Sequence, residues 1–97
     1  MFARVVNLQF QPGTTEEASR VVREAIVPAM QNIQGFRGQY LLVQEDSARA
    51  VSINLWDAVD DLAAFESSPL YGELLGQLKS MLAAPPAAEV FSVSVQA

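Results

Sequence analysis

The sequence predicts a single α+β domain whose elements follow the order β-α-β-β-α-β. Three observations predict it: strand-like alternation near both ends, two stretches with apolar residues at helical spacing, and two adjacent β-rich runs between them. A chain of 97 residues is long enough for one compact core. We therefore expect one domain over residues 1–97.

The first strand is expected over Phe2–Phe10, where apolar and polar residues alternate with a period of two. Arg4 shares one face with most of the apolar residues. That face comprises Phe2, Arg4, Val6, Leu8 and Phe10, and the other comprises Ala3, Val5, Asn7 and Gln9.

A helix is expected to follow the Pro12-Gly13 turn. Thr14-Thr15-Glu16-Glu17 offers a capping box, in which a Thr oxygen accepts a backbone N–H and Glu17 reaches back to the cap. Pro28 cannot donate to the carbonyl of Glu24, so we expect a kink or two helical pieces there. The apolar stripe continues across it: Ala18, Val21, Val22, Ala25, Ile26, Ala29, Met30 and Ile33.

A β-hairpin is expected next. Gly35 ends the helix, and the β-rich runs Phe36–Gln44 and Ala50–Trp56 flank a polar Glu45-Asp46-Ser47 loop.

The C-terminal part predicts two short helical segments and a last strand. Asp57 can cap a helix that buries Leu62 and Phe65, and Ser68 can cap a second one with Pro69 at its first position. An extended linker over 83–88 leads to a strand over 89–95, with Phe91, Val93 and Val95 on one side. The inner face of the second helix comprises Tyr71, Leu74, Leu75, Leu78 and Met81 or Leu82.

This order is that of a ferredoxin-like fold, in which both helices cover one face of a four-stranded antiparallel sheet. The face away from the helices is predicted to be semi-polar and closed by a second subunit, which gives a homodimer. We assign to it Ala3, Val5, Asn7, Gln9, Ser52, Asn54, Trp56, Val90, Ser92 and Ser94. A hydrophobic fraction of 51% with only 18% charged residues favours such a buried surface.

Composition excludes several partners and chemistries. Six basic and eleven acidic residues give a net charge of −5, which disfavours nucleic acid and anionic membranes as partners. The absence of Cys and His removes thiolate nucleophiles, the commonest metal ligand and imidazole acid–base chemistry. We expect no metal and no cofactor. With no targeting or membrane-spanning pattern, we expect a soluble, cytoplasmic protein.

Short motifs along nearly the whole chain resemble the antibiotic biosynthesis monooxygenase (ABM) domain family, a branch of the dimeric α/β barrels. The motifs are Gly35-Phe36-Arg37-Gly38-Gln39-Tyr40, Val51-Ser52-Ile53-Asn54-Leu55-Trp56-Asp57, Leu62-Ala63-Ala64-Phe65 and Ser68-Pro69. The resemblance implies a dimeric barrel of ABM type over residues 1–97. The family includes cofactor-free oxygenases of polyketide phenols, quinol oxygenases and haem-degrading enzymes.

The resemblance transfers to a few residues. Trp56 matches the tryptophan that lines the substrate pocket in the polyketide oxygenases. Their asparagine four residues earlier is replaced by Ser52, while Asn54 lies two residues before the tryptophan. The haem-degrading branch needs an axial histidine, which is absent, and an asparagine at the position of Val6. Haem is therefore not expected.

The candidate site comprises Asn54 and Trp56 as catalytic residues and Arg4, Tyr71, Tyr40 and Ser52 as substrate-binding residues. Each also has a structural interpretation: Trp56 can seal the sheet, Asn54 can be satisfied by neighbours, Arg4 can pair with a carboxylate, and Tyr71 can pack in the core. Tyr40 fits either sheet face. The apolar row of Val51, Ile53 and Leu55 sends Asn54 and Trp56 away from the helices, whereas family pockets lie between sheet and helices; the sequence leaves both placements open.

Three functions fit these features. The first is a cofactor-independent monooxygenase acting on a small electron-rich aromatic such as a phenol or quinol, in which the ionised substrate itself passes an electron to O₂. The second is a module that binds a small apolar or aromatic molecule without turnover. The third is a purely structural dimer.

Overall fold

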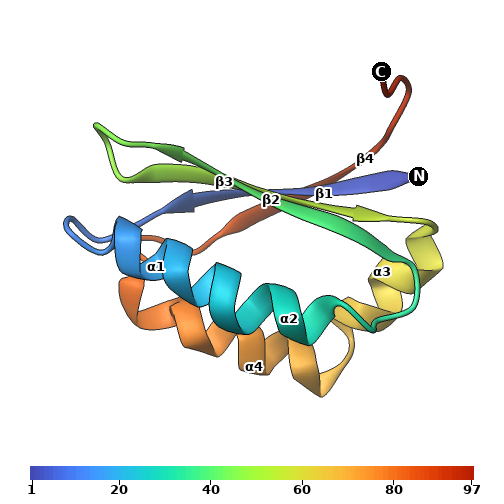
Figure 1. Cartoon of the computed structure of the whole chain (residues 1–97), viewed down its shortest axis with the longest axis horizontal. Coiled ribbons are helices and arrows are strands. Elements are labelled where there is room, and N and C mark those ends of the chain that lie inside the picture. The colour runs from blue at the N-terminus through green and yellow to red at the C-terminus, as the bar shows by residue number, and fades with distance from the viewer.

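The chain folds into two layers, a four-stranded sheet with all helices on one side of it (Figure 1). A computed structural model describes residues 1–97. The elements are β1 (Phe2–Gln9), α1 (Thr15–Val21), η1 (Val22–Ile26), α2 (Val27–Met30), β2 (Phe36–Gln44), β3 (Arg49–Trp56), α3 (Val59–Glu66), α4 (Pro69–Leu78), η2 (Lys79–Met81) and β4 (Ala87–Ser92).

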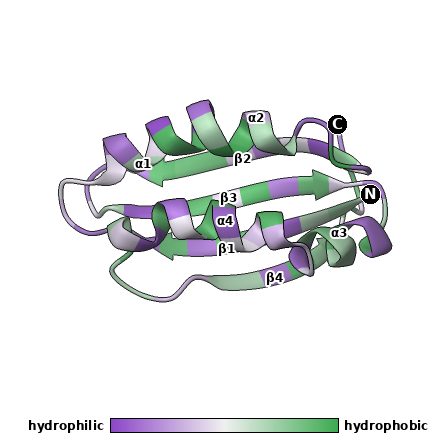
Figure 2. Ribbon diagram, turned by 90° about the horizontal axis from the view of Figure 1, so that it is seen from below, coloured by the Kyte–Doolittle hydropathy of each residue, from purple (hydrophilic) through white to green (hydrophobic).

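The sheet has the strand order β2-β3-β1-β4, and every neighbouring pair is antiparallel. This confirms the α+β, ferredoxin-like fold. The sheet is open, with β2 and β4 at its edges, and one face carries no helix (Figure 1). Seen from the helix side, α1 and α2 lie over β2, and α4 lies over β3 and β1 (Figure 2).

The first helix adapts to Pro28 by widening one turn. Residues Val22–Ile26 form a π-helical turn, in which the N–H of Val27 bonds to the carbonyl of Val22, five residues back. In a regular α-helix the ring of Pro28 would meet the carbonyl of Glu24, which lies inside this turn. The irregularity expected at Pro28 thus takes the form of a π-helical turn just before it, and the helix continues without a break to Met30. Val22, Ile26 and Met30 remain buried on one side.

None of the three predicted helix caps makes the expected side-chain hydrogen bond to a backbone N–H. Thr14 is the N-cap residue of α1, but its hydroxyl donates to the carbonyl of Gln11 at 2.8 Å and caps no N–H. Ala58, not Asp57, is the N-cap residue of α3, because the carboxylate of Asp57 instead binds Arg37. Ser68 is the N-cap residue of α4 with Pro69 at the first position, as predicted, but its hydroxyl donates to the carbonyl of Phe65 at 2.6 Å and caps no N–H.

The strand register corrects the predicted faces of β3 and β4. Directly opposed residues lie on the same face, and Arg4 is opposite Asn54 and Val90, with Phe2 opposite Trp56 and Ser92. Ser52, Asn54, Trp56, Val90 and Ser92 therefore share the helix side with Arg4, not the open face. The open face instead carries Ala3, Val5, Asn7, Tyr40, Leu42, Val51, Ile53, Leu55, Glu89 and Phe91.

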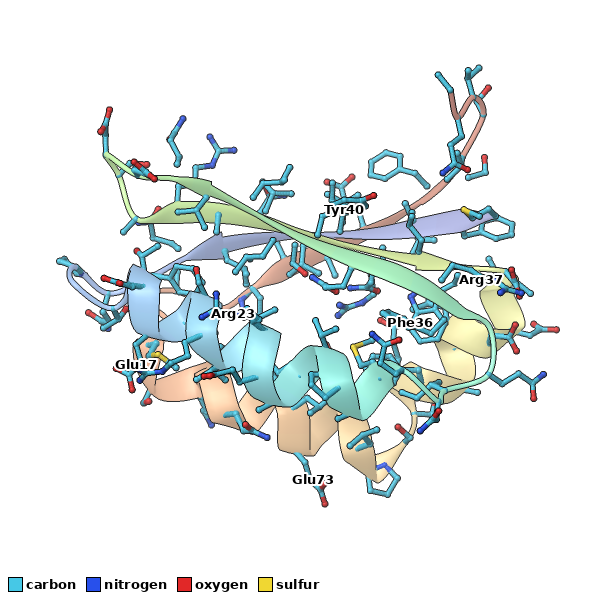
Figure 3. The ribbon with its side chains drawn as sticks, in the orientation of Figure 1. Glu17, Arg23, Phe36, Arg37, Tyr40 and Glu73 are labelled. Atoms are coloured by element: carbon cyan, nitrogen blue, oxygen red, sulfur yellow. The ribbon has the colours of Figure 1, made fainter.

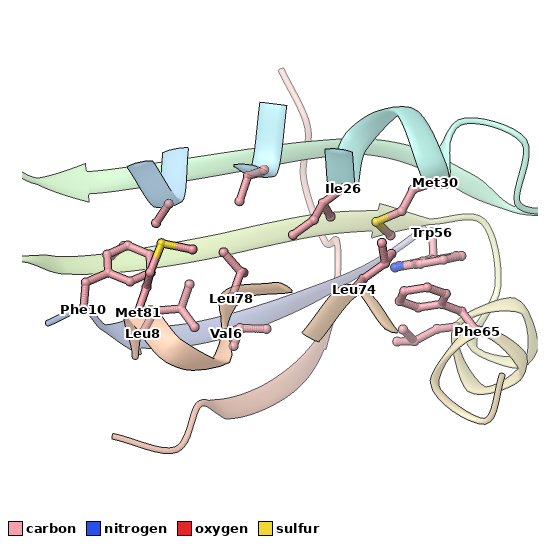
Figure 4. Packing of buried hydrophobic residues seen from close by; sticks show 14 residues of the cluster. Val6, Leu8, Phe10, Ile26, Met30, Trp56, Phe65, Leu74, Leu78 and Met81 are labelled. Atoms are coloured by element: carbon pink, nitrogen blue, oxygen red, sulfur yellow. The ribbon is translucent and has the colours of Figure 1, made fainter. Parts of the chain in front are cut away.

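The hydrophobic core lies between the sheet and the helices (Figure 4). Trp56 is its most enclosed large side chain, with 0% exposure, and its ring stacks on Phe65 at 5.2 Å and meets the edge of Phe36 at 5.6 Å. Such aromatic pairs contribute about 0.5–1.5 kcal/mol beyond their buried area. No helix of the structure has the length and apolar character needed to cross a membrane.

Candidate functional site

A cavity of about 90 Å³ lies between the sheet and the helices. Its helical wall is apolar and comprises Val22, Ile26, Met30, Leu74, Leu75 and Leu78. Its polar lining comes mainly from the strands: Arg4, Gln39, Ser52 and Asn54, joined by Tyr71 from α4. A few polar groups in an apolar wall are typical of a small-molecule site, although such sites usually span about 300–1,000 Å³.

The polar residues form a line across the sheet because of strand register. Arg4 on β1 is opposite Asn54 on β3, and Asn54 is opposite Gln39 on β2. The next row toward the hairpin places Ser52 beside Val6 and Leu41. Opposed side chains on one face have Cβ atoms about 4.5–5.5 Å apart, so these groups can act on one ligand.

Asn54 is 4% exposed, and its carboxamide is held by Trp56. The indole Nε1–H of Trp56 donates to Oδ1 of Asn54 at 2.7 Å. An indole nitrogen only donates, so it fixes the oxygen of the amide toward Trp56 and leaves the NH₂ group on the other side.

Arg4, 7% exposed, is held by two partners from the helical layer. Its Nε donates to Oε2 of Glu66 at 3.0 Å, and its Nη2 donates to the hydroxyl oxygen of Tyr71 at 2.7 Å. The guanidinium also lies 5.1 Å from the centroid of the Tyr71 ring, within range of a cation–π contact. Glu66 is therefore the ion-pair partner of a buried arginine.

The structure brings together four of the six predicted site residues. Arg4, Ser52, Asn54 and Tyr71 line the cavity. Trp56 does not line it; the indole lies behind Asn54 in the aromatic stack with Phe65. The pocket-lining place that the resemblance implies for Trp56 is therefore not found, because its ring is fully buried against Phe36 and Phe65.

Tyr40 lies on the opposite face of the sheet and is 58% exposed. A β-bulge between Phe36 and Gly38 adds one residue to β2, so the alternation reverses after Phe36. Figure 3 shows Phe36 on the helix side and Tyr40 on the open side. Gly38 within a strand-like run was a signal for the bulge.

Gln39 was not predicted as a site residue. Its Nε2 donates to Oγ of Ser52 at 2.7 Å and to the carbonyl of Tyr40 at 3.0 Å. Since Oγ of Ser52 accepts this bond, its hydroxyl proton remains available to another acceptor.

An exposed ion pair lies outside the cavity, at the end of β3. Both guanidinium nitrogens involved, Nε and Nη2 of Arg37, lie 2.6 Å from the carboxylate oxygens of Asp57. The hydrogen bond from Arg37 lowers the pKa of Asp57, and the same bond raises the pKa of Arg37. No three acidic side chains are grouped closely enough to bind a metal ion.

Comparison with known proteins identifies a matching family and two curated relatives. Residues 1–75 match the family model described as antibiotic biosynthesis monooxygenase. Two uncharacterised Mycobacterium tuberculosis proteins, MT2635 and Rv2558, are each 30% identical over 64 residues. That match covers 66% of this chain and 27% of theirs, so the chain spans about a quarter of the length of these relatives.

Solved structures share the fold at lower identity. A monooxygenase from the gene ActVA-Orf6 of Streptomyces coelicolor, in complex with nanaomycin D, has a TM-score of 0.87 at 20% identity, covering 99% of this chain and 89% of that one. Rv0793 from Mycobacterium tuberculosis has a TM-score of 0.78 at 21% identity, covering 99% and 97%. Likeness at this identity establishes the fold alone.

Proposed function

This chain belongs to the antibiotic biosynthesis monooxygenase family, and from that premise we propose that it is a cofactor-independent monooxygenase acting on a small electron-rich aromatic such as a phenol or quinol. The observation that carries the proposal is the amide donor of Asn54 beside an apolar cavity. A donor at that place stabilises negative charge on a ligand oxygen.

The reaction needs little from the protein. A phenol and O₂ give a quinone and water, with one oxygen atom in each product and all four electrons supplied by the substrate. The ionised ring passes an electron to O₂, so the cavity has to bind the ring, favour its ionisation and exclude water. Arg4 and Asn54 would meet the phenolate oxygen, and Ile26 and Leu74 would contact the ring.

The size of the cavity limits the substrate to one ring at most. Its volume of about 90 Å³ is smaller than an engineered cavity of about 150 Å³ that binds benzene. Even a single ring therefore needs the helical wall to move outward, and a polycyclic phenol would need a larger movement.

Oxygen consumption with a panel of phenols and quinols tests the proposal. The wild type should consume O₂ faster than buffer, and Asn54→Ala should lower turnover by on the order of a hundredfold, the usual effect of losing an oxyanion donor. Asn32→Ala is the matched control, because Asn32 is exposed and outside the cavity. Uptake at the buffer rate across the panel would contradict the proposal, and uptake unchanged in Asn54→Ala would contradict the assigned site.

Ligand binding without turnover is the second candidate function. It is favoured by the chemistry of the lining, in which the ionisable side chains Arg4 and Tyr71 are already bonded to each other. Saturable binding of a panel compound with no oxygen uptake would select this function over the first.

We also propose that a second copy of the chain covers the open sheet face. Proteins of this family are typically dimeric. Tyr40, Leu42 and Phe91 on this face are each at least half exposed, and the chain after β4 turns toward the same side (Figure 1). A stable interface buries about 800 Å² per partner, so apolar exposure of this kind suits one.

Light scattering after size exclusion tests the dimer. The wild type should elute as a dimer at micromolar concentration, and Leu42→Lys should shift it toward the monomer. Val59→Lys is the control, because Val59 is 46% exposed on α3, away from the open face. A monomeric wild type would contradict the proposal. A cytoplasmic location stays a prediction.

A further inference from the structure

The cavity offers hydrogen-bond donors whose partners are not in the chain. Every fully enclosed polar side-chain atom of the protein has a hydrogen-bond partner. A polar atom of Arg4 or Asn54 that has no partner is therefore not fully enclosed and borders open space. Nδ2 of Asn54 and Nη1 of Arg4 make no hydrogen bond within the chain, and both residues line the cavity. These two nitrogens are therefore available to a ligand.

The orientation of the Asn54 carboxamide is fixed by Trp56, a residue that does not line the cavity. A free carboxamide can rotate and offer either its oxygen or its nitrogen. Because the Nε1–H of Trp56 can only donate, the oxygen of Asn54 is retained at 2.7 Å and the NH₂ group remains for the ligand. Trp56 is 0% exposed and packed against Phe65, so it cannot follow a rotation of the amide.

Arg4 is fixed in a similar way from the helical layer. Glu66 and Tyr71 occupy Nε and Nη2, which orients the planar guanidinium and leaves Nη1 unoccupied. Arg4 and Asn54 are directly opposed in the sheet, with Cβ atoms about 4.5–5.5 Å apart. Both side chains come from the sheet wall of the cavity, so the two donors approach a ligand from one side. Two oxygens on adjacent ring carbons point to the same side of a ring and can meet both donors, whereas oxygens at opposite ends of a ring point in opposite directions and cannot.

We propose that the cavity selects a single aromatic ring with two adjacent oxygen acceptors, held by Asn54 and Arg4, and that Trp56 is the positioning residue that sets this preference. The inference rests on the proposed function but concerns recognition and not turnover. An ionised catechol has the required chemistry. A ring with one oxygen, or with two oxygens at opposite ends, leaves one donor unused.

Binding of two matched chromophores tests the proposal. 4-Nitrocatechol and 4-nitrophenol differ by one hydroxyl group, and the absorption of each reports its ionisation. The wild-type protein, in its native oligomeric state, should bind 4-nitrocatechol on the order of tenfold or more tightly, the value of one hydrogen bond to a charged acceptor, and should bind it in ionised form. Equal affinity for the two compounds, or binding of neither, would overturn the inference.

Asn54→Asp tests the donor, because it exchanges the NH₂ group for an acceptor of the same shape. The variant should lose affinity for 4-nitrocatechol by on the order of tenfold to a hundredfold. Asn32→Asp adds the same charge at an exposed position and should bind as the wild type does. Unchanged binding by Asn54→Asp would overturn the role of Asn54.

Trp56→Phe tests the positioning role. It removes the indole N–H, so the amide of Asn54 becomes free to rotate, and the preference for 4-nitrocatechol over 4-nitrophenol should fall while binding of 4-nitrophenol is retained. An unchanged preference would contradict the role of Trp56. If the variant does not fold, hydrogen exchange in the wild type replaces it: the single Trp gives one indole N–H signal, which should be strongly protected, and rapid exchange would contradict the bond to Asn54.

These outcomes separate the inference from the proposed reaction. Selective binding of 4-nitrocatechol without oxygen uptake from any phenol would support the inference and contradict the monooxygenase. Oxygen uptake from phenols without selective binding of 4-nitrocatechol would support the monooxygenase and contradict the inference.

Discussion

Replacing Gly35 by alanine should destabilise the protein through two separable effects. Gly35 has φ +83°, in the left-handed region, which costs an alanine about 1–2 kcal/mol. A Cβ at this position would also overlap the side chain of Asp61, with the Cβ of Asp61 only 2.6 Å away. The turn matters to the site because the carbonyl of Gly35 accepts the N–H of Asp57 at 2.8 Å, which joins the start of β2 to the end of β3.

Gly13 is the matched control, since it also has φ +83° but no atom within 4 Å of an added Cβ. Gly13→Ala should therefore lower the free energy of unfolding by only the cost of the left-handed backbone, about 1–2 kcal/mol. Gly35→Ala should lower it further. For a chain of this length 1 kcal/mol lowers Tm by about 4–8 °C, so thermal unfolding resolves the difference. Adding Asp61→Ala should restore part of the stability of Gly35→Ala and none of that of Gly13→Ala. Equal losses in the two single variants would refute the steric argument.

Three further predictions concern the cavity wall, a surface ion pair and a helix. Leu74→Ala should cost about 2–5 kcal/mol by chemical denaturation and enlarge the cavity, so that affinity for two-ring phenols rises relative to one-ring phenols; an unchanged ratio would contradict the placement of Leu74. The lowered pKa of Asp57 means that its bond to Arg37 stabilises the fold above the ordinary Asp pKa of 3.8 and loses this effect as pH falls through the lowered value. The stability difference between wild type and Asp57→Asn should therefore be present at pH 6 and vanish in strong acid, and a pH-independent difference would contradict it. Gly76→Ala, in an exposed part of α4, should raise stability by about 0.5–1 kcal/mol, and a loss would indicate a contact that the structure lacks.

The sequence predicted the element order because periodicity is local. The alternation in β1 identified Arg4, Val6 and Leu8 as one face, and the structure confirms that face. Asn54 was recognised because asparagine is unfavourable in mid-strand, so its presence needed a reason.

The predicted faces of β3 were wrong because hydrophobicity does not say what buries a residue. Val51, Ile53 and Leu55 form the more apolar row, yet they lie on the open face, which no helix of the chain covers. Asn54 and Trp56 point toward the helices because they satisfy each other through one hydrogen bond. A bond between residues two positions apart on a strand is invisible to a pattern of apolar and polar letters.

Long-range partners were also outside the reach of the sequence. Glu66 lies 62 residues from Arg4 along the chain, and the packing of α3 brings them to 3.0 Å. Tyr40 was predicted to bind substrate, but its sheet face could not be assigned, because one inserted residue at the bulge in β2 reverses every later side chain.

The central claim is that the ligand binds between the sheet and the helices, against Asn54. A ¹⁵N-labelled sample titrated with 4-nitrocatechol tests it most directly, because each assigned amide reports its own surroundings. The side-chain NH₂ signals of Asn54 and the signals of Arg4 and Tyr71 should shift together and saturate, while those of Tyr40 on the open face should not move. Shifts confined to Tyr40 and its neighbours, with Asn54 unaffected, would contradict it.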